Sequence, residues 1–179
     1  LYVAGTLSYT FRLKSVAMVD VIMLASLFTI RVIAGAAAID VELSFWLMAF
    51  SVFVFLSLAM VKRVSELLNL KTNSKIAAKG RGYYVHDIQI LKSMGGSSGY
   101  LAVLVMALYV NSAEITRLYS SPKLLWLVLP LLLYWVSRMW LVTARGEMNE
   151  DPIVYAIKDP RSWIVGASIA IITLLATFT

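Results

Sequence analysis

The sequence predicts an all-α fold, a polytopic transmembrane helical bundle, on three observations. Of the 179 residues, 60% are hydrophobic and only 15% are charged, a balance outside that of water-soluble domains. Several apolar segments approach the length of about 20 residues that a helix needs to cross a bilayer. Cysteine is absent and histidine occurs once, which excludes thiol nucleophiles and metal sites built from several cysteines or histidines.

Hydropathy predicts five full spans after a short apolar stretch. The stretch, residues 1–8, lacks the charged region and cleavage site of a signal peptide, and we expect it to end a helix that begins upstream. The expected spans are residues 16–39, 44–61, 99–112, 124–143 and 162–179. The third has a short apolar run and must include residues 88–98 if it crosses the bilayer. We expect one domain over residues 1–179 whose N-terminal part is missing.

Lys and Arg are distributed unequally between the two sides of the predicted bundle. Connections 40–43 and 113–123 together carry two of them. Twelve lie in the segments of the other side, residues 9–15, 62–98 and 144–161. Cytoplasmic connections are rich in Lys and Arg, so we expect this side to be the cytoplasmic face of the inner or plasma membrane. The net charge of +6 then needs no nucleic acid as a partner.

Two ionisable residues lie inside the first expected span. Asp20 and Arg31 are 11 residues apart, which places them on nearly the same face of an α-helix. A charge in hydrocarbon is costly and tends to face a protein interior or a polar cavity. We therefore expect both to face the interior and to line such a cavity. The alternative is that Arg31 binds nearby carbonyl groups or reaches an interface.

A charged cluster follows the second span directly. Lys62 and Glu66 are one helical turn apart, with Arg63 beside them. Two cations and a carboxylate at the mouth of a cavity suit a phosphate group with its metal ion. The alternative is a basic anchor at the membrane surface that contains a helical ion pair.

The last connection also combines cations with carboxylates. Asp151 and Asp159 offer oxygen ligands, which Mg²⁺ prefers, and Arg145 could bind a phosphate. The alternative is a solvated acidic loop. We expect the lone histidine, His86, at the surface, since no serine or cysteine nucleophile motif lies near it and the sequence has no second histidine to share a metal ion.

Three glycines, Gly95, Gly96 and Gly99, lie at the start of the third span. Small residues let membrane helices approach closely, so these glycines predict tight helix packing. The alternative is a loop that binds phosphate, but no Walker or dinucleotide-binding motif is present.

The ordered motifs resemble the UbiA superfamily of intramembrane prenyltransferases, most closely its decaprenyl-phosphate phosphoribosyltransferase-like branch. The resemblance covers nearly the whole chain. It rests on these short motifs: Ser8-Tyr9, Leu13-Lys14, Asp20-Val21, Arg31-Val32, Ala34-Gly35, Ser44-Phe45-Trp46-Leu47, Lys62-Arg63, Glu66-Leu67, Asp151-Pro152 and Asp159.

The resemblance implies that the chain is the C-terminal portion of a UbiA-like bundle with a cytoplasm-facing cavity. Its first aspartate-rich motif would lie upstream of Leu1. The implied reaction is Mg²⁺-dependent transfer of phosphoribose from phosphoribosyl diphosphate to a polyprenyl phosphate, an isoprenoid lipid of the cell envelope. One alternative is transfer of a prenyl group from its diphosphate to an aromatic or other acceptor. A second is a transporter or scaffold without enzymatic activity.

The resemblance also implies roles for individual residues. Lys62 and Arg63 would bind diphosphate, and Glu66 would bind Mg²⁺ or a ribose hydroxyl. Two further carboxylates would lie on the metal side of the site, Asp151 and Asp159. Secondary candidates for substrate binding are Asp20, Arg31, Lys14 and Arg145. Cations replace the aspartates of the aromatic prenyltransferases around residue 62, which counts against aromatic prenylation.

The charge distribution makes a testable prediction about topology. Single cysteines introduced at Lys75 and Asn149 should both react with a membrane-impermeant thiol reagent from the cytoplasmic side, because both segments belong to the basic face. Intact and inverted membrane vesicles provide the two sides. Labelling of the two positions from opposite sides would contradict the topology.

Overall fold

The structure is a computed structural model that describes residues 15–40, 44–72, 82–148 and 151–178. Every regular element within these ranges is a helix. Five helical segments are long and apolar enough to span a membrane. Three are single helices, α2 (Val19–Ala38), α3 (Phe45–Thr72) and α8 (Pro160–Phe178), and two join a 3-10 helix to the α-helix that follows it, residues Val85–Val110 with α4 (Ile88–Val110) and Pro122–Ala144 with α6 (Val128–Ala144). The predicted all-α polytopic bundle is confirmed, and the protein belongs to the integral membrane class.

Two helices are longer than the apolar runs that predicted them. α3 continues past residue 61 to Thr72, so the charged cluster at Lys62 lies on a continuous helix. α4 begins at Ile88 and includes residues 88–98. The two 3-10 helices that open spans are η2 (Val85–Asp87), before α4, and η3 (Pro122–Leu127), before α6. Residues 1–8, the expected end of an earlier helix, lie outside the described residues.

Two short helices lie in the connections, where hydropathy gave no signal. α5 (Ala113–Leu118) follows α4, and α7 (Pro152–Lys158) precedes α8. Local chemistry explains α7. Asp151 is its N-cap, with a side-chain oxygen that accepts from the Ile153 N–H at 3.0 Å, and proline at the first helical position suits a helix start.

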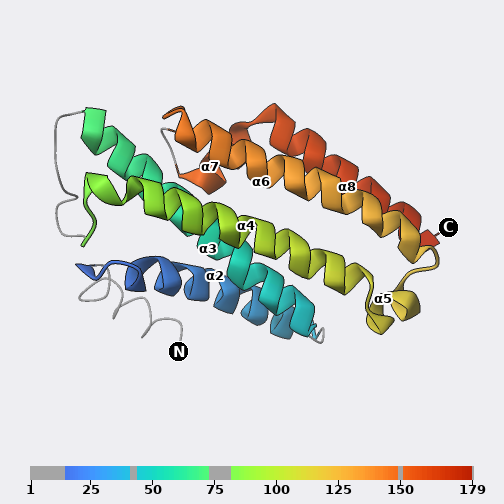
Figure 1. Ribbon diagram of the computed structural model, residues 1–179. Helices are drawn as coiled ribbons and strands as arrows, with labels where there is room; N and C mark the ends of the chain where they lie inside the picture. Colours follow the sequence, from blue (N-terminus) through green and yellow to red (C-terminus); the bar gives the residue numbers. More distant parts are fainter. Residues whose placement is uncertain (1–14, 41–43, 73–81, 149–150, 179) are drawn as a thin grey trace.

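The long helices alternate in direction (Figure 1), which gives the bundle two distinct ends. α3 packs against α2 and α4, α4 packs against α6, and α6 packs against α8. One end gathers the starts of α2, α4 and α8, the ends of α3 and α6, and α7. α5 and η3 lie at the other end. The segments predicted to form the basic face therefore share one end wherever they are described.

Close packing joins α3, α4 and α6 near the middle of the bundle. A Cβ added at Gly95 would lie 2.3 Å from the Trp140 ring and 2.9 Å from Met60, whereas one at Gly96 would meet nothing within 4 Å. The Ser57 hydroxyl donates to the Gly95 carbonyl at 2.8 Å and accepts from the Trp140 indole N–H at 3.0 Å. These hydrogen bonds fix the ring in place.

Gly99 lies in the same contact. A Cβ there would lie 2.6 Å from Val136. The prediction of close packing is therefore confirmed for Gly95 and Gly99 and is wrong for Gly96, which faces open space.

The two neighbouring glycines provide a matched test of this packing. Gly95→Ala should lower the free energy of unfolding in detergent by about 1–3 kcal/mol, because the ring of Trp140 cannot move away without losing its hydrogen bond. Gly96→Ala should leave stability unchanged or raise it by up to about 1 kcal/mol, since alanine is the better helix former. Equal effects at the two positions would contradict the packing.

Candidate functional site

A buried ion pair joins α2 to α3 at the end of the bundle that contains α7. The Arg63 Nε atom lies 2.8 Å from the Asp20 Oδ2 atom, and the two side chains are 1% and 0% exposed. The Arg63 Nη1 atom also binds the Glu66 carboxylate, one turn further along α3. Arg63, which we expected to bind diphosphate, thus has its guanidinium group inside a protein network.

Tyr83 completes this network from the segment before α4. Its hydroxyl donates to Asp20 Oδ1 at 2.5 Å and accepts from the Met18 N–H at 2.7 Å. Burial, and then the hydrogen bond to Asp20, raise the pKa of Tyr83 above its ordinary value, so the phenol keeps its proton. Gly82 allows the approach, because a Cβ there would lie 2.8 Å from the Ser15 carbonyl oxygen.

A second ion pair, between Lys62 and Asp151, lies beside a small cavity. The Lys62 Nζ atom is 2.6 Å from Asp151 Oδ2, and the side chains are 39% and 32% exposed. The cavity, of about 100 Å³, is bounded by α2, α3 and the start of α7. Its remaining lining is apolar: Leu24, Phe28, Phe55, Leu58, Ala59, Pro152 and Ile153. An accessible cation and carboxylate therefore border an apolar space.

A larger apolar groove, of about 640 Å³, runs between α6, α7 and α8, with Leu58 of α3 at its edge. Its walls include Trp135 of α6 and Trp163 of α8. Pro152 and Ile153 line both the groove and the smaller cavity. The start of α7 thus stands between the groove and the Lys62–Asp151 pair.

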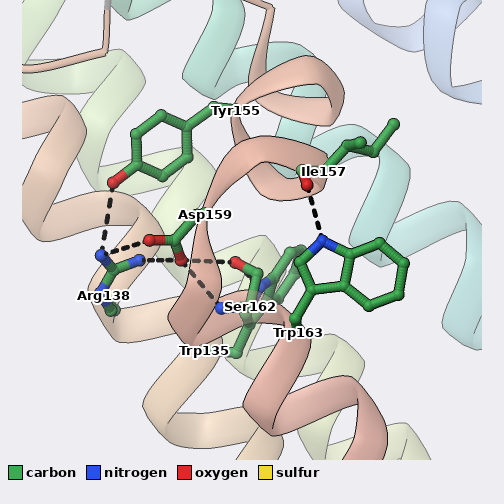
Figure 2. Close-up of polar contacts among 7 residues, drawn as sticks. All are labelled: Trp135, Arg138, Tyr155, Ile157, Asp159, Ser162 and Trp163. Carbon is green, nitrogen blue, oxygen red and sulfur yellow. Dashed lines mark hydrogen bonds and ion pairs between the residues drawn. The ribbon is translucent and has the colours of Figure 1, made fainter.

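Asp159 joins α6 to the junction of α7 and α8. Figure 2 shows its carboxylate accepting two hydrogen bonds from Arg138, at 2.6 and 2.9 Å, and two from the N–H and hydroxyl of Ser162, at 2.8 and 2.9 Å. Burial disfavours the carboxylate, but these donors outweigh burial and lower the pKa of Asp159. We expected Asp159 to bind Mg²⁺, and in the structure it caps α8 and binds Arg138.

Three aromatic side chains support the same junction (Figure 2). The Trp163 indole N–H donates to the Ile157 carbonyl at 2.6 Å, and the Trp135 indole N–H donates to the Ser162 hydroxyl at 3.1 Å. Tyr155 lies over Arg138, with its ring centroid 5.9 Å from the guanidinium carbon. These contacts fix the orientation of α7 relative to α8. They therefore also fix the position of Asp151, at the start of α7.

The expected metal ligands do not form one cluster. Among the described residues, no group of three or more Asp, Glu or His side chains lies close enough to hold a metal ion. Glu66, Asp151 and Asp159 instead each bind a different cation, Arg63, Lys62 and Arg138 respectively. Glu66 is 33% exposed, and like Asp151 it remains accessible.

The other candidates lie apart from these ion pairs. Asp20 faces the interior as predicted, where it meets Arg63. The same expectation is wrong for Arg31, which is exposed on α2 and lies over the Phe28 ring at 5.0 Å. Arg145 and His86 are both exposed. Lys14 lies outside the described residues.

Comparison with known proteins finds relatives of greater length. The chain is 40% identical over 171 residues to the uncharacterized protein y4nM of Sinorhizobium fredii, which covers 94% of this chain and 33% of that protein. It is 30% identical over 176 residues to the nodulation protein NoeC of Azorhizobium caulinodans, which covers 97% and 57% respectively. The chain thus spans between a third and just over half of these relatives.

A more distant relative has a name that describes a reaction. The decaprenyl-phosphate phosphoribosyltransferase of Mycolicibacterium smegmatis is 26% identical over 160 residues, which cover 88% of this chain and half of that protein. No protein-family model matches the chain.

Two aspartates at the ends of α7 provide a test of the junction. Asp159→Asn should lower the free energy of unfolding by about 3 kcal/mol at neutral pH, because it leaves the largely buried Arg138 without its ionic partner. Asp151→Asn should cost less than about 1 kcal/mol, since its ion pair is partly exposed. Asparagine can cap a helix at either position, so the comparison isolates the lost charge.

The pH dependence provides a second check on Asp159. A lowered pKa in the folded state stabilises the protein above the ordinary aspartate pKa of about 3.9, and this stabilisation is lost as the pH falls through the lowered value. The difference in stability between wild type and Asp159→Asn should therefore shrink below about pH 4. If the difference in stability between wild type and Asp159→Asn stayed constant below about pH 4, the ion pair between Asp159 and Arg138 would be contradicted.

Proposed function

We propose that the chain is part of a UbiA-type intramembrane transferase that acts on a polyprenyl phosphate, with phosphoribosyl diphosphate as the donor. The observation that carries the proposal is the accessible Lys62–Asp151 pair beside an apolar cavity and an apolar groove. A polyprenyl phosphate has the matching chemistry, an anionic head on a long hydrocarbon chain. The relative named decaprenyl-phosphate phosphoribosyltransferase supports this substrate class.

Lys62 is the residue best placed to meet a phosphate. Its ammonium group is more exposed than any other cation in the described ion pairs, and an ammonium group binds phosphate oxygen through charge-assisted hydrogen bonds. A phosphate that binds Lys62 would compete with Asp151 for it. The excess of Lys and Arg at this end supports a site that faces the cytoplasm from the inner or plasma membrane.

Glu66 and Asp151 are the two carboxylates that could hold Mg²⁺. Both are accessible, and Mg²⁺ in phosphate sites usually takes one or two protein carboxylates, with phosphate and water as the other ligands. Glu66 lies one helical turn from Lys62 on α3, and Asp151 binds Lys62, so each could contribute a carboxylate to a metal site that substrate completes. A bound Mg²⁺ would supply positive charge that stabilises the leaving diphosphate.

The proposed reaction needs little covalent chemistry from the protein. An oxygen of the polyprenyl phosphate forms a bond to C1 of the ribose while the bond from C1 to diphosphate breaks, and diphosphate leaves with the electron pair. Lys62 would neutralise negative charge on the phosphates, and the groove would hold the lipid chain so that its phosphate faces C1. Such positioning and fixed charge can provide most of a rate enhancement.

The same apolar groove also fits a prenyl diphosphate, which makes prenyl transfer to an aromatic or other acceptor the second candidate. In that reaction the isoprenoid carries the diphosphate, and the bond that breaks is between its C1 carbon and the diphosphate oxygen. The two candidates differ in the donor and can be separated by one assay.

The assay uses the full-length protein in detergent with radiolabelled phosphoribosyl diphosphate, a polyprenyl phosphate and Mg²⁺. Wild type should form labelled lipid, and Lys62→Ala or Glu66→Ala should lower the rate about a hundredfold, the effect of losing about 3 kcal/mol of electrostatic stabilisation. Arg117→Ala, which changes an exposed arginine at the opposite end, serves as the matched control.

Three outcomes would contradict the proposal. Rates for Lys62→Ala and Glu66→Ala within about threefold of wild type, or about 0.65 kcal/mol, would return these residues to a role as a membrane anchor. Activity with a prenyl diphosphate and none with phosphoribosyl diphosphate would support the second candidate. No transfer with either donor would favour a transporter or scaffold.

A further inference from the structure

Lys62 and Arg63 are neighbours in the sequence but have different surroundings. Successive residues of an α-helix point about 100° apart. Lys62 borders the cavity next to α7 and is accessible. Arg63 points toward α2 and Tyr83, and its side chain is fully buried. Only Lys62 can therefore meet a ligand in the arrangement that the structure shows.

Arg63 connects a buried carboxylate to an accessible one. Its Nε edge lies against Asp20, and its Nη1 atom binds Glu66. Asp20 is in turn held by the Tyr83 hydroxyl. A planar guanidinium group can bind two carboxylates along different edges. The order of contacts, from inside to outside, is Tyr83, Asp20, Arg63 and Glu66.

From this arrangement we infer that Arg63 is a positioning residue, which holds the Glu66 carboxylate at the site and does not touch substrate. Asp20 and Tyr83 hold Arg63 in turn. The inference rests on the proposed function of Lys62 and Glu66. To reach a ligand, Arg63 would have to leave Asp20 as an unpaired carboxylate with no access to solvent, which is strongly unfavourable.

The test compares the stability and the kinetics of matched variants of the full-length protein in detergent. Arg63→Met keeps the length of the side chain and removes its charge. A double variant adds Asp20→Asn, so that neither buried charge remains. Lys62→Met is the comparison for a direct phosphate contact, and Arg117→Met makes the same chemical change at an exposed arginine of the opposite end.

Stability reports on the buried pair without any assumption about activity. Arg63→Met should lower Tm by at least about 6 °C, because Asp20 is left as an uncompensated buried charge. The double variant should recover most of that loss, since neither buried charge remains and the Glu66 side chain is 33% exposed to solvent. Arg117→Met should leave Tm unchanged. No loss in Arg63→Met, or no recovery in the double variant, would overturn the inference.

Kinetics report on the role of Arg63 at the site. In the double variant, kcat should stay at least about tenfold below wild type, as is common when a residue that orients a ligand-binding group is removed. Its KM for phosphoribosyl diphosphate should stay within about threefold of wild type, whereas Lys62→Met should raise KM about tenfold. An Arg63→Met variant that raises KM as much as Lys62→Met, with an unchanged Tm, would show a direct contact and overturn the inference.

The two measurements separate this inference from the proposed function. If wild type transfers no phosphoribose, the proposed function fails, and the recovery of Tm in the double variant alone decides whether Arg63 holds the buried network. If wild type is active and Tm does not recover, the function stands and the positioning role is wrong.

Discussion

The ion pair between Asp20 and Arg63 is the constraint on which the rest of the site depends. A buried carboxylate and a buried guanidinium group are stable only together, so α2 and α3 must meet with these two residues in register. That register turns Lys62, one residue earlier, toward α7 and closes the small cavity against α2. Tyr83 adds the segment before α4 to the same contact, so two helices and this segment meet at one buried charge pair.

The position of α7 depends on two further ion pairs of different character. At its end, Asp159 is enclosed by Arg138 and Ser162 and is largely shielded from water. At its start, Asp151 forms an ion pair with Lys62 that is partly exposed to solvent. Water weakens the second pair, so a phosphate could replace Asp151 at modest cost. One end of α7 is thus fixed, while the other end can exchange its partner beside the apolar cavity and groove.

Much of the fold could be predicted from hydropathy, because bilayer thickness sets the length of each span. The interior position of Asp20 and the close packing at Gly95 and Gly99 followed from the cost of a buried charge and from side-chain size. Hydropathy and periodicity could not predict which residue forms an ion pair with each charged side chain. Periodicity places a residue on a helix face, but it does not say which distant segment covers that face.

Arg63 and Asp159 show this limit directly. Their sequence context suggested an anion site and a metal site, and each side chain is instead enclosed by protein groups. The signal for Tyr83 was weak, an aromatic residue after a glycine-rich connection, because its contact with Asp20 joins residues 63 positions apart. Arg31 shows that a shared helix face does not imply a shared environment. It lies three turns from Asp20 on nearly the same face of α2, yet Asp20 is buried and Arg31 is exposed.

In the proposed site, Lys62 meets the ligand while Arg63 stays within the protein network. An experimental structure of the full-length protein with magnesium diphosphate bound would distinguish the roles of these two residues. We expect the Lys62 ammonium group to lie at hydrogen-bond distance, about 3 Å, from a phosphate oxygen, and Arg63 still to contact Asp20 and Glu66. A structure in which Arg63 binds the diphosphate and Asp20 has lost its partner would contradict it.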